Sequence, residues 1–570
     1  MRVNLTEHSH PDDTPTCNLQ ELLALADEMG IVVTHDFMFG DQFYPVDDGT
    51  LTDVAAEVRD QAWRMGSHAS LGVWCGNNEM ASGYSEGHHM YSATAFYSKL
   101  YFATIRGNLS VVDPARSASW ISSTPSQGNE TAAVPFNRHG SSVELRGDVH
   151  YYGLADAWNT SCWDVAEHAP RARFVTESGW ISWPSLLTMA PTLDPGDYGF
   201  NSSVPGARVQ HPPAQRECTH NVESNWRWPD RHPGTSATGY RDALWMTQVA
   251  AAQCLVASIE FWRSTESELV NTTYPLSPLG WAMLGDNAGV MYWQADDTWP
   301  GPSWSTIELG GRLKVGHYAV QRAFAPLMVS GRVGSDGQLH VYFSRSDHRA
   351  PPLGTAAAGM IMKAVLRITA FRWSGGHGAV ELPVPLPAPH STARLLSRDI
   401  EEVLSSISCS DSTDTLEPGQ AGPCCSARTE CVLGLEVVIL GTAAAETTVA
   451  SNTVYLSPLH QVTTMVADPG LAVREVVPAA GGSSSSVGHL VFNVTVTAAR
   501  TPAALVWLET ALPGRWSDNG VLQTTPELQL QWTTDEEAVT AARLAALVSV
   551  RSLVDVAAGY SNSSTITSDI

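Results

Sequence analysis

A change of pattern near Pro326 constrains the fold of this chain more than any other feature of its sequence. Before it, short apolar runs alternate with stretches of helical periodicity, as in successive strand–helix units with parallel strands. After it, apolar runs such as residues 339–343 and 437–440 are separated by turns rich in glycine, proline and serine. The sequence therefore predicts a multidomain protein with an α/β part followed by an all-β part.

The α/β part contains seven candidate strands, whereas a closed (β/α)8 barrel requires eight. Each is a short apolar run, and together they lie at residues 1–3, 30–36, 70–75, 119–123, 143–152, 173–176 and 289–293. We therefore expect residues 1–326 to form a (β/α)8 TIM barrel that lacks its first strand at the N-terminus.

The all-β part is long enough for two domains. Strand-like runs fall on both sides of the Ser-Pro pair at residues 457–458, and residues 481–486 form a Gly/Ser-rich loop. Short strands with regular turn signals are typical of β-sandwiches, so we expect two immunoglobulin-like domains, at residues 327–456 and 457–558. The Ser/Thr-rich end, residues 559–570, is predicted to be a disordered tail.

The balance of charge excludes some classes of partner. The chain has 570 residues with 33 Lys and Arg against 58 Asp and Glu, and its net charge is −25. Nucleic acids and anionic membranes attract basic surfaces, so neither is expected as a partner. No run of 18 apolar residues occurs, and we therefore expect no membrane insertion.

Cysteines and glycosylation signals indicate the compartment. Cys409, Cys424, Cys425 and Cys431 lie close together, and the adjacent pair suits disulfides better than a zinc site. Eight Asn-x-Ser/Thr sites occur, which is more than chance predicts and indicates the secretory route. The first residues do not resemble a signal peptide, so we expect a chain that lacks its own N-terminus.

Polar side chains follow several of the candidate strands. Glu79 ends the run Gly-Asn-Asn-Glu after the third strand, and Glu177 ends the sixth. His150 and Tyr152 lie at the end of the fifth strand, and Trp293 lies at the end of the seventh. Active sites of barrels are built from such strand ends, and two carboxylates are what glycoside hydrolysis requires. Aromatic rings offer flat apolar faces to sugars.

Each of these residues is also compatible with an ordinary structural role. A Glu at a strand end is often solvated or placed at a helix N-terminus. Residues such as Trp293 and His150 are more often packed in a core than part of a site. The residues alone therefore predict a carbohydrate-active barrel and no more specific activity.

Several segments resemble glycoside hydrolase family two, and in particular its β-mannosidases. Residues 73–79, with the sequence VWCGNNE, are similar to the acid/base motif of that family, and residues 174–185 resemble its nucleophile region. Residues 292–305 resemble the final barrel strand. Further matches occur at residues 36–39, 147–150, 311–314, 317–318 and 513–520. The resemblance extends from about residue 18 to 555 and is nearest to the animal lysosomal type.

The resemblance implies a retaining exo-β-mannosidase that removes terminal β-D-mannose from N-glycan or mannan oligosaccharides. Glu79 would be the general acid/base, Glu177 the nucleophile, and Asn78 the partner of the sugar 2-hydroxyl. The other residues lining the −1 subsite would be His150, Tyr152, Trp183 and Trp293. The oligosaccharide is the only partner implied, with no cofactor or metal, and the location would be lysosomal, vacuolar or secreted. We expect the Glu177 carboxylate to raise the pKa of Glu79.

The chain also departs from the family pattern. The family places two β-domains before the barrel, and it has an Arg-Val-Trp-Gly-Gly-Gly segment where this chain has Arg2-Val3-Asn4. We therefore expect an N-terminally truncated β-mannosidase, with a catalytically impaired or vestigial carbohydrate-binding fragment as the alternative. Another activity of the family, exo-glucosaminidase or β-glucuronidase, is disfavoured by Asn77-Asn78 and by the Ser-Trp-Pro run at residues 182–184.

Overall fold

The computed structural model describes most of the chain. It covers residues 2–6, 19–40, 44–80, 95–125, 147–152, 161–229, 236–273, 281–346, 363–409, 423–440, 446–479 and 489–557. Two compact units are present, and each is described by itself. Unit 1 consists of Met1–Tyr151, Pro170–Ser178 and Ser267–Tyr292, and unit 2 consists of Tyr152–Ala169, Gly179–Glu266 and Trp293–Ile570.

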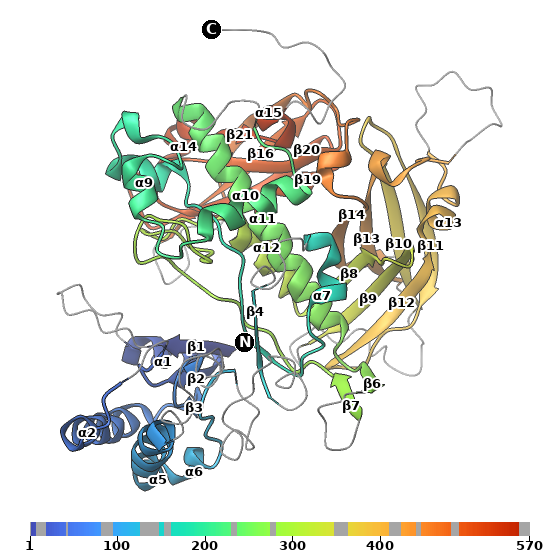
Figure 1. The fold of residues 1–570 in the computed structure, drawn as a ribbon. Helices are drawn as coiled ribbons and strands as arrows, with labels where there is room; N and C mark the ends of the chain where they lie inside the picture. The colour runs from blue at the N-terminus through green and yellow to red at the C-terminus, as the bar shows by residue number, and fades with distance from the viewer. Residues whose placement is uncertain are drawn as a thin grey trace, which may run out of the picture. The chain divides into compact units, whose positions relative to one another are not determined.

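Unit 1 is built on parallel strands. Strands β1 (Arg2–Thr6), β2 (Val32–Asp36) and β3 (Leu71–Cys75) form a parallel sheet in that order (Figure 1), and Cys75 of β3 is bridged in parallel to Ile121. Strand β4 (Val149–Tyr151) pairs in parallel with β5 (Val175–Ser178), which is bridged in parallel to Val290. All seven predicted strands are therefore confirmed as strands or bridges, except that residues 143–146 lie outside the described residues.

Helices cover the first of these sheets. The helical segments of unit 1 are α1 (Leu19–Met29), α2 (Asp48–Met65), η1 (Ser98–Arg106), α5 (Gly107–Val112) and α6 (Pro114–Ser117). Asp47 caps α2 by accepting a hydrogen bond from the Thr50 backbone N–H at 3.1 Å. The buried face of α2 repeats at helical spacing, through Val54, Val58, Ala62 and Met65. This face packs into one apolar cluster with Trp74 of β3, so the helix holds that strand in place. An antiparallel hairpin, β6 (Leu269–Thr273) and β7 (Trp281–Gly285), completes the unit.

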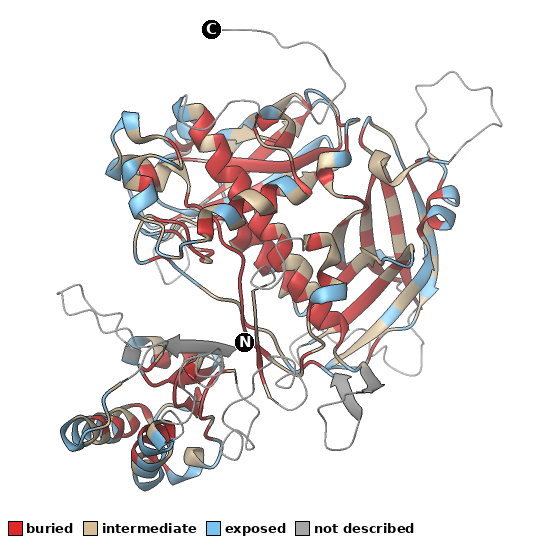
Figure 2. Cartoon of the chain, in the orientation of Figure 1, coloured by how far each residue is buried: buried red, intermediate tan, exposed pale blue. Residues whose placement is uncertain are grey.

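Unit 2 contains a long central helix, α11 (Ala237–Ser264). Shorter helical segments accompany it: η4 (Cys162–Asp164), α7 (Val165–His168), α8 (Leu186–Met189), η5 (Ala190–Thr192), η6 (Pro195–Asp197), α9 (Ser203–Ala207), α10 (Ala214–Asn225) and α12 (Val315–Ala323). A disulfide joins Cys162 to Cys254 and so ties η4 to α11. Figure 2 shows that α11 is buried along most of its length.

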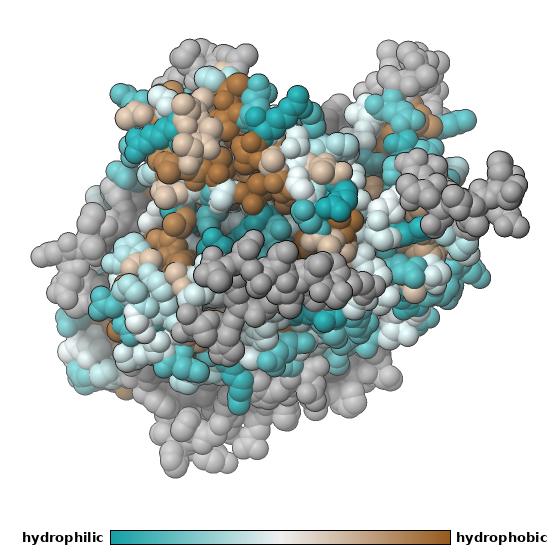
Figure 3. Space-filling model, turned by 90° about the horizontal axis from the view of Figure 1, so that it is seen from above, coloured by the Kyte–Doolittle hydropathy of each residue, from teal (hydrophilic) through white to brown (hydrophobic). Residues whose placement is uncertain are grey.

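By length and composition α11 is the one helix among the described residues that could cross a membrane. In unit 2, however, 78% of its apolar window is buried inside the protein, as in the core helix of an α/β domain. It also carries Asp242 and Arg263, both of which are buried and paired with protein groups. On the face drawn in Figure 3, apolar residues gather in one area, with hydrophilic residues around it. We therefore interpret α11 as a core helix.

Two β-sandwiches follow α12. The strands of the first are β8 (Leu327–Val333), β9 (Gln338–Arg345), β10 (Lys363–Arg372), β11 (His377–Val384), β12 (Ser391–Asp399), β13 (Cys431–Leu440) and β14 (Glu446–Tyr455). They form sheets of order β12-β9-β8 and β11-β10-β13-β14 around one apolar core, which confirms an all-β fold here. The short helical segments of this sandwich are α13 (Ile400–Ser405) and η7 (Arg428–Glu430), and η8 (Leu459–Gln461) follows its last strand.

The second sandwich shares its core with the helices of unit 2. Its strands are β15 (Leu471–Pro478), β16 (Leu490–Ala498), β17 (Ala503–Glu509), β18 (Arg515–Trp516), β19 (Val521–Gln523), β20 (Glu527–Thr534) and β21 (Ser549–Arg551). The sheets have the orders β15-β16-β20-β18 and β19-β17-β21, followed by α14 (Ala541–Leu547) and α15 (Leu553–Val556). The Trp507 ring meets Tyr318 of α12 at 5.9 Å, so this sandwich packs directly against α12.

The clustered cysteines form disulfides, as the sequence predicted. Cys409 pairs with Cys424 and Cys425 with Cys431, so the adjacent cysteines bond to different partners. Together with Cys162–Cys254, three disulfides are present among the described residues. Cys75 and Cys218 are free and buried.

The Cys162–Cys254 bond offers a test of what stabilises unit 2. It spans 92 residues of sequence, so its loss enlarges the freedom of the unfolded chain. We expect the double variant Cys162→Ala, Cys254→Ala to lose about 2–5 kcal/mol of unfolding free energy, measured by urea denaturation with circular dichroism. The matched change at Cys425 and Cys431, which are 6 residues apart, should cost less. Equal losses at the two sites would contradict an explanation from loop length.

Candidate active site

Glu79 lies in the turn that follows β3. Gly76 opens this turn at a point where a Cβ atom would lie 2.6 Å from the carbonyl oxygen of Ser122, so only glycine fits without displacement. Glu79 has a positive φ of 56°, which is uncommon for a residue other than glycine. Its backbone N–H donates to the Thr124 carbonyl oxygen at 2.7 Å, which ties the turn to the neighbouring chain segment. The surrounding structure therefore imposes the strained backbone from which the Glu79 side chain projects.

The two asparagines of this turn have different environments. Asn77 is fully buried, donates to the Ser122 carbonyl oxygen at 2.7 Å and accepts from the Met80 backbone N–H at 3.1 Å. Asn78 is half-buried, and its backbone N–H donates to the Phe39 carbonyl oxygen at 2.9 Å. Asn77 thus holds the turn together, whereas the Asn78 side chain is partly accessible to a ligand.

Glu177 and His150 lie on paired strands. The parallel register of β4 and β5 places His150 opposite Glu177. Their side chains are 6% exposed for His150 and 9% for Glu177. Thr176, beside Glu177, donates its hydroxyl to the Asp148 carboxylate at 2.6 Å, a second contact between the two strands. Pairing of β4 with β5 therefore brings a histidine and a carboxylate, 27 residues apart in sequence, into contact.

The His150 ring joins the two glutamates. Its Nδ1 atom lies 2.7 Å from Oε1 of Glu79 and 2.6 Å from Oε2 of Glu177. One ring nitrogen carries at most one proton, so both carboxylates compete for a single N–H donor. The three donor and acceptor atoms all lie within 4.8 Å of one another. Three of the predicted site residues therefore form one compact triad, which we call the Glu79–His150–Glu177 triad.

The triad shifts the proton affinity of its members. Burial opposes protonation of His150, but the charge and hydrogen bond of Glu177, together with those of Glu79, hold the pKa of His150 well above its usual value. Burial likewise disfavours the ionised form of Glu79, yet the hydrogen bond and charge of His150 outweigh it and lower the pKa of Glu79. The prediction of a raised Glu79 pKa is therefore wrong in this arrangement. It considered the Glu177 carboxylate without the imidazole that lies between the two.

The same three side chains are close enough to ligate one metal ion. In this arrangement Nδ1 of His150 lies within hydrogen-bond distance of an oxygen of each carboxylate. The triad thus brings together side chains of the types that act as acids, bases and nucleophiles.

The other predicted substrate-binding residues belong to unit 2. Tyr152 and Trp293 are half-buried there. Trp183 is 0% exposed. Its indole N–H donates to Gln215 at 2.8 Å, and its backbone N–H donates to the Thr247 hydroxyl at 3.1 Å. Trp183 is therefore a core residue of unit 2. Of the aromatic residues predicted to bind substrate, Tyr152 and Trp293 have accessible surface.

The predicted set omits Trp304, another half-buried aromatic residue of unit 2. The Tyr152 ring meets it edge-on at 5.8 Å between centroids, and the His211 ring lies 5.1 Å away. A Cβ atom on Gly179 would lie 2.8 Å from Cδ1 of Trp304, so glycine allows this close approach. The motif Pro-Ser-Trp at residues 302–304 was visible in the sequence, but its spacing did not reveal that it meets Tyr152.

Comparisons with known proteins indicate what this chain is similar to. Residues 468–556 match the Ig_mannosidase family, an Ig-fold domain. The β-mannosidase of Rattus norvegicus is 30% identical over 522 residues, which cover 90% of this chain and 52% of that protein. The β-mannosidase A of Aspergillus clavatus is 31% identical over 424 residues, covering 69% of this chain and 42% of that protein.

The fold is also similar to that of a solved structure. The crystal structure of the β-D-mannosidase from Dictyoglomus thermophilum matches with a TM-score of 0.66 and 17% identity, covering 97% of this chain and 56% of that one. The chain spans about half the length of the curated relatives it matches. Sequence similarity along most of the chain and the matching C-terminal domain show that the chain is a homologue of the β-mannosidases, and the solved structure shows a similar fold.

Proposed function

We propose that the protein is a retaining exo-β-mannosidase that hydrolyses terminal, non-reducing β-D-mannose residues of oligosaccharides. The observation that carries this proposal is the triad, in which oxygens of Glu79 and Glu177 lie within 4.8 Å of each other. Retaining glycosidases hold their carboxyl groups about 5–5.5 Å apart, whereas inverting enzymes need about 6.5–9.5 Å to admit a water molecule. The short separation supports direct attack by one carboxylate.

The proposed reaction has two steps. In the first, Glu177 attacks the anomeric carbon while Glu79 protonates the glycosidic oxygen, and a mannosyl-enzyme forms as the aglycone leaves. In the second, Glu79 takes a proton from water, whose oxygen displaces Glu177 and restores the β configuration. Asn78 is proposed to bind the 2-hydroxyl, where hydrogen bonds strengthen in the transition state. Tyr152 and Trp293 are proposed to complete the sugar subsite, whereas the buried Trp183 is proposed to support it from the core of unit 2.

We propose that His150 supplies the proton that Glu79 donates in the first step. Glu79 must carry a proton when the glycosidic bond breaks, but beside a protonated His150 it is ionised. The Nδ1 proton, 2.7 Å from the Glu79 oxygen, can pass to that carboxylate and leave a neutral imidazole. His150 would thus supply the acid for the first step.

We propose that the whole protein has the architecture and the cellular location of the β-mannosidases it resembles. The seven parallel strand segments support a (β/α)8 barrel within residues 1–326, followed by sandwiches at 327–456 and 457–558. Three disulfides and eight Asn-x-Ser/Thr sites support a lysosomal, vacuolar or secreted location, with β-mannoside oligosaccharides as substrates. No observation favours a purely carbohydrate-binding fragment.

The nucleophile assignment can be tested by chemical rescue. We expect Glu177→Ala to lower kcat for an aryl β-mannoside by on the order of 10⁴-fold, because the covalent intermediate can no longer form. Added azide should restore turnover by attacking from the vacated side and should yield α-mannosyl azide, identified by NMR. In Glu79→Ala, azide should instead yield the β-anomer, because it attacks the mannosyl-enzyme. Glu167→Ala, on the exposed face of α7, is the control and should leave kcat unchanged. If the two variants gave azide products of the opposite configurations, Glu79 would be the nucleophile and Glu177 the acid/base.

The triad also predicts how stability depends on pH. The folded-state pKa of His150 lies above its usual 6.5, and that of Glu79 lies below its usual 4.5. Stabilisation by their contact is therefore complete between about pH 4.5 and 6.5. It is lost as the pH rises through the folded-state pKa of His150, or falls through that of Glu79.

We expect the difference in melting temperature between wild type and His150→Gln to be largest in this window and to shrink on both sides. Thermal unfolding followed by circular dichroism from about pH 3 to 9 measures it. His168→Gln, at an exposed position of α7, is the matched control and should show no such maximum. A difference that stays constant with pH would contradict a charged triad.

A further inference from the structure

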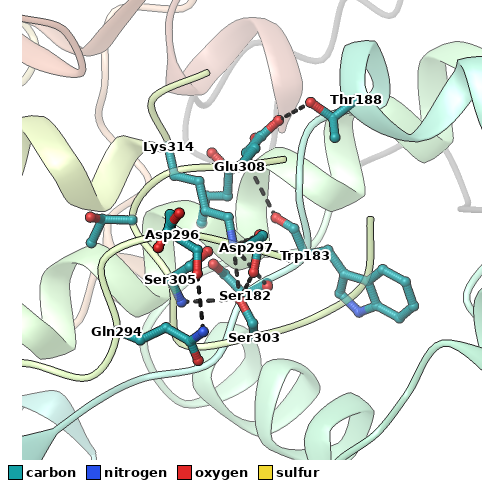
Figure 4. Close-up of polar contacts among 12 residues, drawn as sticks. Ser182, Trp183, Thr188, Gln294, Asp296, Asp297, Ser303, Ser305, Glu308 and Lys314 are labelled. Carbon is teal, nitrogen blue, oxygen red and sulfur yellow. Dashed lines mark hydrogen bonds and ion pairs between the residues drawn. The ribbon is translucent and has the colours of Figure 1, made fainter. Parts of the chain in front are cut away.

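Unit 2 contains a buried ion pair that the proposed reaction does not use. Lys314, the residue before α12, is 1% exposed, and its Nζ atom lies 3.3 Å from Oδ2 of Asp297, whose side chain is 2% exposed. Figure 4 shows the two side chains pointing toward each other, with Ser182 and Ser303 beside them. A lysine buried to this degree is rare, because leaving water is costly for an ammonium group.

The pair connects two chain segments. Nζ of Lys314 lies 3.5 Å from the Ser182 carbonyl oxygen and 3.5 Å from the Ser303 hydroxyl. The Ser303 hydroxyl donates to the second oxygen of Asp297. The backbones of Ser182 and Ser303 also exchange hydrogen bonds, of 2.8 and 3.1 Å. The ammonium group therefore lies where residues 182 and 303 are joined, and it contacts both.

The loop held in this way carries accessible aromatic residues. Trp304 directly follows Ser303, and Trp293 lies four residues before Asp297. The Gln294 backbone N–H donates to the Trp304 carbonyl oxygen at 3.3 Å, so the two ends of the loop are paired. Trp293 and Trp304 are half-buried, whereas the ion pair is fully buried.

A buried ion pair at this position calls for a reason other than stability. Apolar side chains of similar volume often replace such pairs without loss of stability, because the cost of removing two charges from water offsets their attraction. An ammonium group, however, directs hydrogen bonds to several oxygens at once, and here these oxygens belong to residues 182, 297 and 303. Apolar side chains would fill the space without setting the positions of these oxygens.

We propose that Lys314 and Asp297 are positioning residues for substrate binding, which act by holding the loop that bears Trp293 and Trp304. The inference rests on the proposed function and adds to it: the ion pair determines affinity for the sugar, and the triad performs the chemistry. Without the pair, the aromatic residues should be held less firmly. Their contacts with the sugar should then weaken equally in the bound substrate and in the transition state. Such a change raises KM with little effect on kcat.

The experiment separates positioning from mere stability by removing one charge or both. Lys314→Met leaves Asp297 unpaired and should destabilise the fold, whereas the double variant Lys314→Met, Asp297→Leu removes both charges and should recover stability. The matched control is Arg551, whose side chain is 12% exposed and forms an ion pair with the buried Asp242 at 2.8 Å in the same unit. Arg551→Met should also lower the melting temperature.

Kinetics and hydrogen exchange provide the readouts. For an aryl β-mannoside, we expect the double variant to fold like wild type, with KM raised about tenfold or more and kcat changed by less than about threefold. The shape of its pH–rate profile should be unchanged, because the triad is intact. Backbone amides of residues 293–305 should exchange faster in the double variant but not in Arg551→Met. Lys314→Arg, which keeps the charge, should restore part of the wild-type KM.

Three results would overturn the proposal. The first is a double variant with wild-type KM and wild-type exchange at residues 293–305, which would make the pair purely structural. The second is an equal change of KM in Arg551→Met, which would attribute the effect to general destabilisation. The third is faster exchange without any change of KM, which would show that the loop does not contribute to binding. Failure of the wild type to hydrolyse the mannoside would instead count against the proposed function, and the exchange measurement would still report whether the pair holds the loop.

Discussion

The candidate site depends on one histidine placed between two acidic groups. Glu79 and Glu177 bring like charges within a few ångströms of each other in a largely buried place, and alone they would repel. The His150 ring relieves this repulsion because its Nδ1 atom contacts an oxygen of each carboxylate. The pairing of β4 with β5 and the strained turn at Glu79 both serve this contact. Without the imidazole, one carboxylate would have to be protonated or move away.

Unit 2 uses buried charge in a different way. The Lys314–Asp297 pair lies next to backbone and hydroxyl oxygens, so its charge is spread over several hydrogen-bonding groups rather than shared by two acids. Glu308 acts similarly, since its buried carboxylate accepts hydrogen bonds from Ser185, Thr188 and Gln248. These groups hold the loops that follow residue 182 and residue 293. Both units therefore use a few buried ionised groups to determine where loops lie, while apolar packing supplies the core.

Several features could be predicted from residue patterns because their causes are local. Short apolar runs predicted all seven parallel strand segments. A strand that is buried on both faces needs apolar side chains wherever it passes through the core. The adjacent Cys424 and Cys425 predicted disulfides, since a zinc site needs wider spacing. The pKa of Glu79 could not be predicted in this way. Its direction depends on an imidazole 71 residues away in sequence, and the prediction considered only the second carboxylate.

The sequence by itself determined the classes of structure, the motifs and their resemblance to the β-mannosidases, because these depend on residue types and short spacings. Tertiary structure decided which residues meet. Asn77 and Asn78 are identical and adjacent in sequence, yet only Asn77 is buried as a support of the turn. Trp183 and Trp304 belong to similar motifs, yet Trp183 lies in the core and Trp304 meets Tyr152. Burial and long-range contact arise from packing between segments far apart in the chain, which no local pattern specifies.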